Sequence, residues 1–202
     1  MATITQVTSH AQAYVKGNSN LLTSEEVRIA QTVNNIVNNY YSWRWGITSG
    51  TNITVVQSTQ EYNLAAADQN EVRSIVEAWL LTGTTDLSPL IVFDNPPVPT
   101  FDTEGRPWAI SLISESRVRL YPNPDAAYTL SFRFQNSGAI FTANTESYEA
   151  PARFDEGIKA GVIWQFLEFM DDQRSEIWKN TFFGLLEQQK MVEMRRLHTK
   201  KD

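Results

Sequence analysis

Histidine and cysteine, which most often supply a general base, a nucleophile or a metal ligand, are scarce in this sequence. The histidines are His10 and His198, each near a chain end expected to be mobile, and cysteine is absent. A Ser–His triad needs an imidazole that is held in place, so neither histidine is a good base, and a Cys–His pair is impossible. The lack of cysteine also excludes disulfides and thiolate zinc sites and fits a protein made in a reducing cytoplasm.

Adjacent carboxylates are the next candidates for chemistry, since they could bind a cation or share a proton. The pairs are Glu25–Glu26, Asp155–Glu156 and Asp171–Asp172. The first two fall at expected helix starts, where acids complement the helix dipole. Asp171 and Asp172 lack the ligand spacing of a calcium loop, so a solvated joint between helices is the favoured interpretation. The phosphate-binding patterns GxxxxGK[ST] and GxGxxG are absent, and we predict no catalytic centre, no metal and no cofactor.

Arginine and tryptophan supply two further candidate groups. Arg117 and Arg119 alternate along one expected strand and so share a face, and Arg133 lies on the next strand. The three could line a channel or partner face, with an outward polar sheet surface as the favoured alternative. Trp43 and Trp45 follow an expected helix, where they could stack on a ligand but more often fill the seam between a helix and a sheet.

Charge is unevenly distributed along this acidic chain, whose net charge is −6. Residues 1–150 hold 8 basic and 14 acidic side chains, whereas residues 190–202 hold 5 and 2. An acidic body argues against a general nucleic-acid binder. The basic end could meet an acidic partner or a phosphate backbone, or it could simply complement the dipole of its own helix.

Periodicity indicates where the helices and strands lie. Residues 23–41 begin with the capping box Thr23-Ser-Glu-Glu and carry an apolar face at helical spacing. Residues 150–198 predict two helices with an acidic joint, and between these regions the period changes to two. Residues 117–121 and 128–134 alternate cleanly around the sequence Pro-Asn-Pro-Asp, which predicts a β-hairpin.

These patterns predict an α+β fold: a helical bundle, made of one N-terminal helix plus a C-terminal helical hairpin, with an inserted antiparallel β domain. The predicted parts are a flexible N-terminal arm at 1–22, the bundle at 23–46 and 150–198, the β domain at 47–149, and the basic C-terminal tail end at 199–202. No run of apolar residues is long enough to span a membrane, and the first ten residues do not resemble a secretory signal.

The order of these features resembles the head-to-tail adaptor proteins of tailed bacteriophages, also called connector or tail tubular proteins. The resemblance covers about residues 22–195, and Ala65 stands where the family usually has a proline. It is carried by aromatic residues at the end of the first helix (Tyr40, Tyr41, Trp43, Trp45), the strand Glu61-Tyr-Asn-Leu, the run Arg119-Leu-Tyr-Pro-Asn-Pro, the strand Tyr128-Thr-Leu-Ser-Phe-Arg-Phe and the helix start Pro151-Ala-Arg-Phe.

The resemblance implies a non-enzymatic structural protein at the head–tail interface, or neck, of the virion, assembled in the host cytoplasm. Its copies would form a ring, expected to be a dodecamer, that docks under the portal protein and carries a tail or nozzle protein. Double-stranded DNA would pass through the channel without sequence-specific binding, and no membrane would be involved. By analogy, the portal-docking residues would be Lys190, Arg195, Arg196, Lys200 and Lys201.

Two other functions remain open from the residues alone. A carbohydrate- or peptide-binding module could use Trp43, Trp45, Trp79 and Trp108 as an aromatic platform. A carboxylate-dependent hydrolase is the third candidate, because any two of the 23 acidic residues could converge in a cleft.

Overall fold

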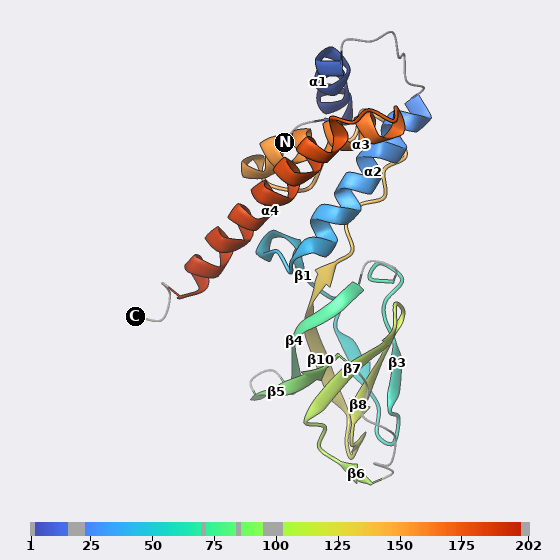
Figure 1. Cartoon of the computed structure of the whole chain (residues 1–202). Coiled ribbons are helices and arrows are strands. Elements are labelled where there is room, and N and C mark those ends of the chain that lie inside the picture. Colours follow the sequence, from blue (N-terminus) through green and yellow to red (C-terminus); the bar gives the residue numbers. More distant parts are fainter. Residues whose placement is uncertain (1–2, 16–22, 70–71, 84–85, 95–102, 199–202) are drawn as a thin grey trace. The chain divides into compact units, whose positions relative to one another are not determined.

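The computed structural model describes residues 3–15, 23–69, 72–83, 86–94 and 103–198, and they divide into two compact units (Figure 1). One unit joins Met1–Gly46 with Gly138–Asp202, and the other is Ile47–Ser137. We name them the helical unit and the sheet unit. Each has its own buried hydrophobic cluster.

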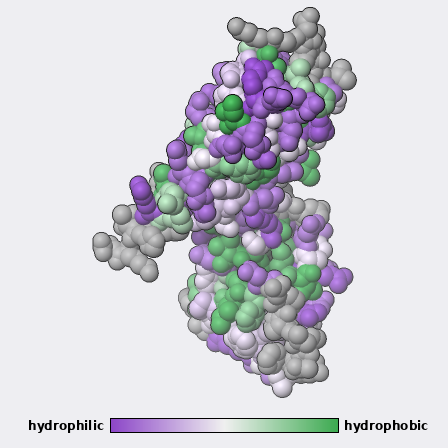
Figure 2. Space-filling view, viewed as in Figure 1, coloured by the Kyte–Doolittle hydropathy of each residue, from purple (hydrophilic) through white to green (hydrophobic). Residues whose placement is uncertain are grey.

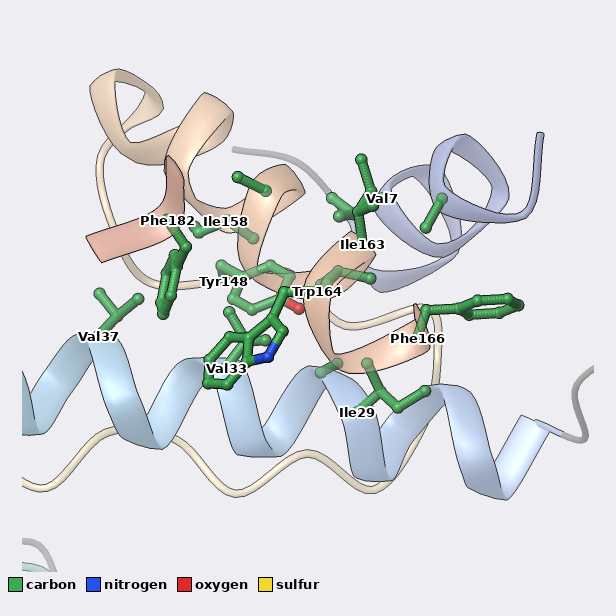
Figure 3. Packing of buried hydrophobic residues seen from close by; sticks show 14 of the residues in the cluster. Val7, Ile29, Val33, Val37, Tyr148, Ile158, Ile163, Trp164, Phe166 and Phe182 are labelled. Carbon is green, nitrogen blue, oxygen red and sulfur yellow. The ribbon is translucent and has the colours of Figure 1, made fainter. Parts of the chain in front are cut away.

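The helical unit is built around one central helix. Its described residues form the helices α1 (Ile4–Val15), α2 (Thr23–Tyr40), α3 (Asp155–Phe169) and α4 (Ser175–His198), with short 3₁₀ turns η1 (Arg44–Gly46) and η2 (Ala152–Phe154). Buried residues lie on all sides of α3, which is the pattern of a helix enclosed by its neighbours. Figure 3 shows Val7, Val33 and Phe182, from three different helices, packed around α3.

Helix α1 lies in the segment predicted as a weakly ordered arm. Its buried residues Ile4, Val7 and Ala11 follow helical spacing and join the core of the helical unit. Glu26, a member of the predicted capping box, accepts hydrogen bonds from Gln12 of α1 (3.2 Å) and from the Asn144 side chain (3.1 Å). These bonds connect α1 and α2 to the segment that precedes α3.

The sheet unit contains a curled sheet around its own core. Its described strands are β1 (Ile47–Ser49), β2 (Ile53–Val55), β3 (Glu61–Asn63), β4 (Val72–Thr82), β5 (Asp86–Phe93), β6 (Glu104–Gly105), β7 (Ala109–Ser114), β8 (Arg117–Tyr121), β9 (Asn123–Pro124) and β10 (Tyr128–Asn136). The strand order is β1-β10-β4-β5-β7-β8-β3, with β2 also paired to β10, while β6 and β9 form a separate pair. Register shifts along β4 and β10 add bend and twist to the longest pairing.

The predicted fold class, a helical bundle with an inserted antiparallel β domain, is wrong. Within the described ranges the protein has four α-helices, and its main sheet is a curled, mixed half-barrel in which β5 and β7 run parallel. The alternating pattern identified strands but carried no information about their direction or partners. Parallel pairing of β5 with β7 depends on the long connection between them, which sequence periodicity does not describe.

The predicted hairpin between residues 117–121 and 128–134 is also wrong. Both segments are strands, but β8 pairs with β7 and β3, whereas β10 pairs with β1, β2 and β4. The intervening residues Asn123 and Pro124 are not a tight turn, because they form β9 and pair with β6. This pairing takes the chain away from β8 before β10 begins.

Candidate docking surfaces

Helix α4 has apolar residues on two opposite faces. Phe182 and Leu186 are fully buried and pack in the core of the helical unit, with Trp178 beside them. The opposite face carries a line of residues that we name the α4 stripe: Ile177, Thr181, Gly184, Gln188 and Met191. Ile177 is 67% exposed and Met191 is 48% exposed. A helix with large apolar residues on both faces is usually covered on both, and among the described residues none covers Ile177 and Met191 fully.

The second half of the stripe borders an open groove. The groove has a volume of about 550 Å³ and is lined by Gly184, Glu187, Gln188, Met191, Val192 and Arg195. A methyl group built on Gly184 would meet no atom within 4 Å. Glycine inside a helix costs about 1 kcal/mol relative to alanine, and within the described part of the chain no close packing against Gly184 offsets that cost.

One contact to α2 holds the middle of α4. The Tyr40 hydroxyl donates a hydrogen bond to Glu187 Oε2 (2.7 Å), and Lys190 Nζ lies 3.3 Å from the same oxygen. The hydrogen bond from Tyr40, and then that from Lys190, lower the pKa of Glu187, while the bond to Glu187 and burial raise the pKa of Tyr40. Lys190, a predicted portal-docking residue, is therefore engaged with Glu187 in this structure.

A second contact holds the far end of α4. The Glu193 carboxylate is almost fully buried, with 3% of its side chain exposed, and it accepts a hydrogen bond from the Arg153 guanidinium of η2. Arg153 also lies over the Phe154 ring, 5.2 Å from its centroid. A buried carboxylate needs such a partner, because desolvating an unpaired charge is costly. The pair therefore fixes where the end of α4 lies in the helical unit.

The remaining predicted docking residues lie at or beyond this end. Arg195 is exposed and lines the α4 groove. Arg196 is the next residue of α4, but its side chain lies outside the described residues, as do Lys200 and Lys201 entirely. Portal docking by this group stays a prediction.

The predicted arginine face is divided by the strand order. Arg117 and Arg119 lie together on β8 and share one partner, since Arg119 donates hydrogen bonds to Glu61 and Arg117 Nη1 lies 3.7 Å from the same carboxylate. The hydrogen bond to Glu61 raises the pKa of Arg119. Arg133 lies on β10, separated from β8 by β4, β5 and β7, and pairs with Glu77 at 3.2 Å. Carboxylate partners reduce the positive charge that these arginines could offer to DNA phosphates.

The tryptophans proposed as a platform are divided between the two units. Trp43 is fully buried, donates from Nε1 to the Val37 carbonyl oxygen (2.6 Å) and contacts the Phe154 ring edge-on. Trp45 is partly buried against the same core of the helical unit. Trp79 and Trp108 belong to the sheet unit. The predicted role of Trp43 and Trp45 in a helix–sheet seam stays a prediction. Because Trp43 is buried, this residue cannot form part of a binding platform.

The sheet unit has an exposed apolar face that the sequence analysis did not identify. Trp79 and Leu81 of β4 lie opposite Pro89 and Leu87 of β5, and Ile91 continues the same face. Leu87 is 57% exposed and Ile91 is 56% exposed. Figure 2 shows hydrophobic side chains gathered on the visible surface of the sheet unit. We give the name outer β face to the five residues Trp79, Leu81, Leu87, Pro89 and Ile91. The available signal was that both strands are apolar at successive positions, which is typical of strands covered on both sides.

Uncovered apolar faces of this kind are typical of proteins that act within assemblies. The sequence matches the SU10 adaptor protein family over residues 2–200, and the chain belongs to this family of phage head-to-tail adaptors. Comparison with curated proteins gives no match. The protein is therefore a structural component of a phage virion, which is consistent with the prediction that it is not an enzyme. Among the described helices, none is both long and apolar enough to cross a membrane.

Proposed function

We propose that copies of this protein form a ring in the virion neck, expected to be a dodecamer. The ring docks under the portal, extends the DNA channel and provides a platform for the tail. Assembly takes place in the host cytoplasm, after which the adaptor seals the portal of the packaged head. Family membership supports this proposal, since the SU10 adaptors are phage head-to-tail adaptors.

The observation that carries the proposal is that each unit, taken by itself, has exposed apolar residues among those described. An adaptor joins two neighbours, so it needs at least two interfaces. The α4 stripe belongs to the helical unit, and the outer β face belongs to the sheet unit. The chain has 20% charged residues, an ordinary share, and yet it exposes these apolar patches. Assembly would explain them, because exposed apolar patches often mark binding sites for other proteins.

We assign the basic segment 190–202 to the portal. Five basic residues and two acidic ones lie in positions 190–202, against an otherwise acidic chain. Opposite charge on the portal would speed association and fix the orientation of docking. The acidic body suits a channel wall, because neutralising DNA phosphates is what produces non-specific affinity for DNA.

We assign the outer β face to the tail or nozzle protein. Leu87 and Ile91 are each more than half exposed, and the partly buried Trp79 lies on the same face of the neighbouring strand. Interface cores are enriched in aromatic and large apolar residues, so this composition fits a binding surface. DNA contacts the ring only as it passes, without recognition of its sequence.

The test uses binding of the full chain to purified portal and tail proteins. The double variant K200E/K201E should lose portal binding and keep tail binding, and L87D/I91D should do the reverse. Ile140→Asp is the matched control, because Ile140 is 80% exposed but lies on neither proposed surface. Wild-type protein that binds neither portal nor tail protein would contradict the proposed function.

A further inference from the structure

The spacing of the α4 stripe fits another helix. Its members lie at positions 177, 181, 184, 188 and 191, so the intervals alternate between four and three residues. This seven-residue repeat keeps one line of side chains facing a partner helix over several turns. A loop or a sheet edge would not require such a repeat. The stripe is therefore suited to receive an α-helix along its length.

The residues in the middle of the stripe favour close approach. Gly184 has no side chain, and its neighbour one turn earlier is Thr181, which is also exposed. Small residues allow two helix backbones to approach closely, so side chains on either side can interlock. The described residues offer no compensation for the cost of an exposed glycine inside α4, but a helix packed against it would supply one.

The helical unit also has a surface that could accept such a helix. An open groove of about 320 Å³ lies along the last turns of α2, lined by Asn35, Ile36, Asn39 and Tyr40. Asn35 and Asn39 are exposed, and Ile36 is partly exposed between them. The lining of the groove thus combines apolar side chains with side-chain amides. The Gln188 amide and the Met191 side chain of the stripe match these two components.

We infer that the α4 stripe of one copy packs in parallel into the α2 groove of the next copy. This inference rests on the ring of the proposed function and names the surfaces that would form it. If Met191 packs on Ile36, then Arg195 reaches Tyr40, because both residues lie one turn further along their helices. The last turn of α2 carries no basic residue, so Arg195 would meet the negative end of the α2 dipole. In the opposite direction the same alignment would place Arg195 beside Thr32, in the middle of α2 and away from the end of its dipole.

The occupant is a second copy because this chain supplies both halves of the contact. The stripe and the groove are different surfaces of the helical unit, so the contact is head-to-tail. Head-to-tail contacts between identical subunits generate closed rings when the rotation between copies closes, and filaments when it does not. A two-fold contact between two α4 stripes would instead stop at a dimer.

The chain contains no cysteine, which makes cross-linking a direct test. The double variant I36C/M191C is treated with a bismaleimide linker that spans about 8 Å, close to the roughly 8–10 Å distance between packed helices. We expect a ladder of covalent multimers larger than dimers on denaturing gels. The matched control is I140C/M191C, since Ile140 is exposed but outside the α2 groove, and it should give no ladder.

Three other outcomes would overturn the inference, and they differ in what they say about the proposed function. Rings seen by mass measurement without 36–191 cross-links would reject these surfaces and leave the proposed function intact. Dimers from M191C alone would show a two-fold contact between α4 stripes. Absence of any oligomer, with or without portal, would reject both the inference and the ring. A second variant, Gly184→Leu, should keep its helical circular dichroism and lose the ring mass.

Discussion

Two identical substitutions at helical glycines should change stability in opposite directions. Gly161 of α3 faces the core, where an added Cβ would lie 2.9 Å from Phe182 Cε2 and 3.0 Å from Val33 Cγ1. Gly184 of α4 faces outward, and its added Cβ would meet no atom within 4 Å. The Phe182 ring packs against Trp164 and Phe183 as well, so it has little room to move.

The magnitudes follow from two terms. Replacing glycine by alanine inside a helix stabilises the folded state by about 1 kcal/mol. Overpacking of a core costs about 1–3 kcal/mol, and this term applies to Gly161→Ala alone. We therefore expect Gly184→Ala to gain about 1 kcal/mol and Gly161→Ala to lose roughly 0–2 kcal/mol. The difference between the two variants measures the close approach of α3 to both α4 and α2.

Urea unfolding of dilute protein, followed by tryptophan fluorescence, would measure both free energies of unfolding. The dependence on urea should stay the same in all three proteins, since neither variant alters the surface exposed on unfolding. Equal stability of the two variants would refute the packing of α3 against α4. Gly184→Ala should also weaken ring formation while it stabilises the subunit, because its methyl group lies on the α4 stripe.

Three further predictions concern the contacts that hold α4 and α2. Arg153→Met should destabilise the protein by about 1–3 kcal/mol in urea unfolding, because it leaves the Glu193 carboxylate buried without its partner. Replacing Glu193 as well, in R153M/E193L, should recover most of the loss, and no recovery would contradict the pairing. The pKa of Glu187 is lowered in the folded state, so its contribution to stability is present above its unfolded pKa, about 4.3, and is lost as the pH falls through the folded pKa. Tyr40→Phe removes the main cause, so in an NMR titration the pKa of Glu187 should rise, and an unchanged value would exclude the Tyr40 bond. Trp43→Ala should cost about 3–5 kcal/mol, measured by thermal or urea unfolding, and a loss below about 1 kcal/mol would contradict its burial.

The helices could be predicted where apolar spacing was regular. Residues 23–41 and the pair within 150–198 were predicted from such spacing, and α2, α3 and α4 lie there. Helix α1 was missed because polar residues dominate the first 22 positions. Its signal was the spacing of Ile4, Val7 and Ala11, which are all buried. A short helix of low hydrophobicity is stabilised by packing more than by its intrinsic helix propensity. Composition alone therefore predicted a flexible arm in place of α1.

The sheet could be predicted strand by strand but not as a whole. Alternation in residues 117–121 and 128–134 correctly located β8 and β10, yet their partners lie far away in the sequence. Proximity in the chain favoured a hairpin, whereas the chain enters β9 between them. Strand pairing is decided by which apolar faces complete the core, and that choice involves the whole unit.

The candidate surfaces were predictable only in part. The basic segment 190–202 was visible as a change in charge, but the α4 stripe was not predicted. Ile177 follows helical spacing as the core residues Phe182 and Leu186 do, yet it is 67% exposed on the opposite face. Spacing of three and four residues describes both faces of α4, so sequence periodicity could not separate them. The exposed fractions of the side chains in the structure distinguish the two faces.

The central claim is that this adaptor acts as a ring on the portal. The most direct measurement is the particle mass of the wild-type protein, alone and mixed with portal, combined with electron microscopy of the mixture. Our account predicts one closed ring of fixed copy number seated coaxially on the portal. A protein that remains monomeric and leaves the portal unoccupied at every concentration tested would contradict it.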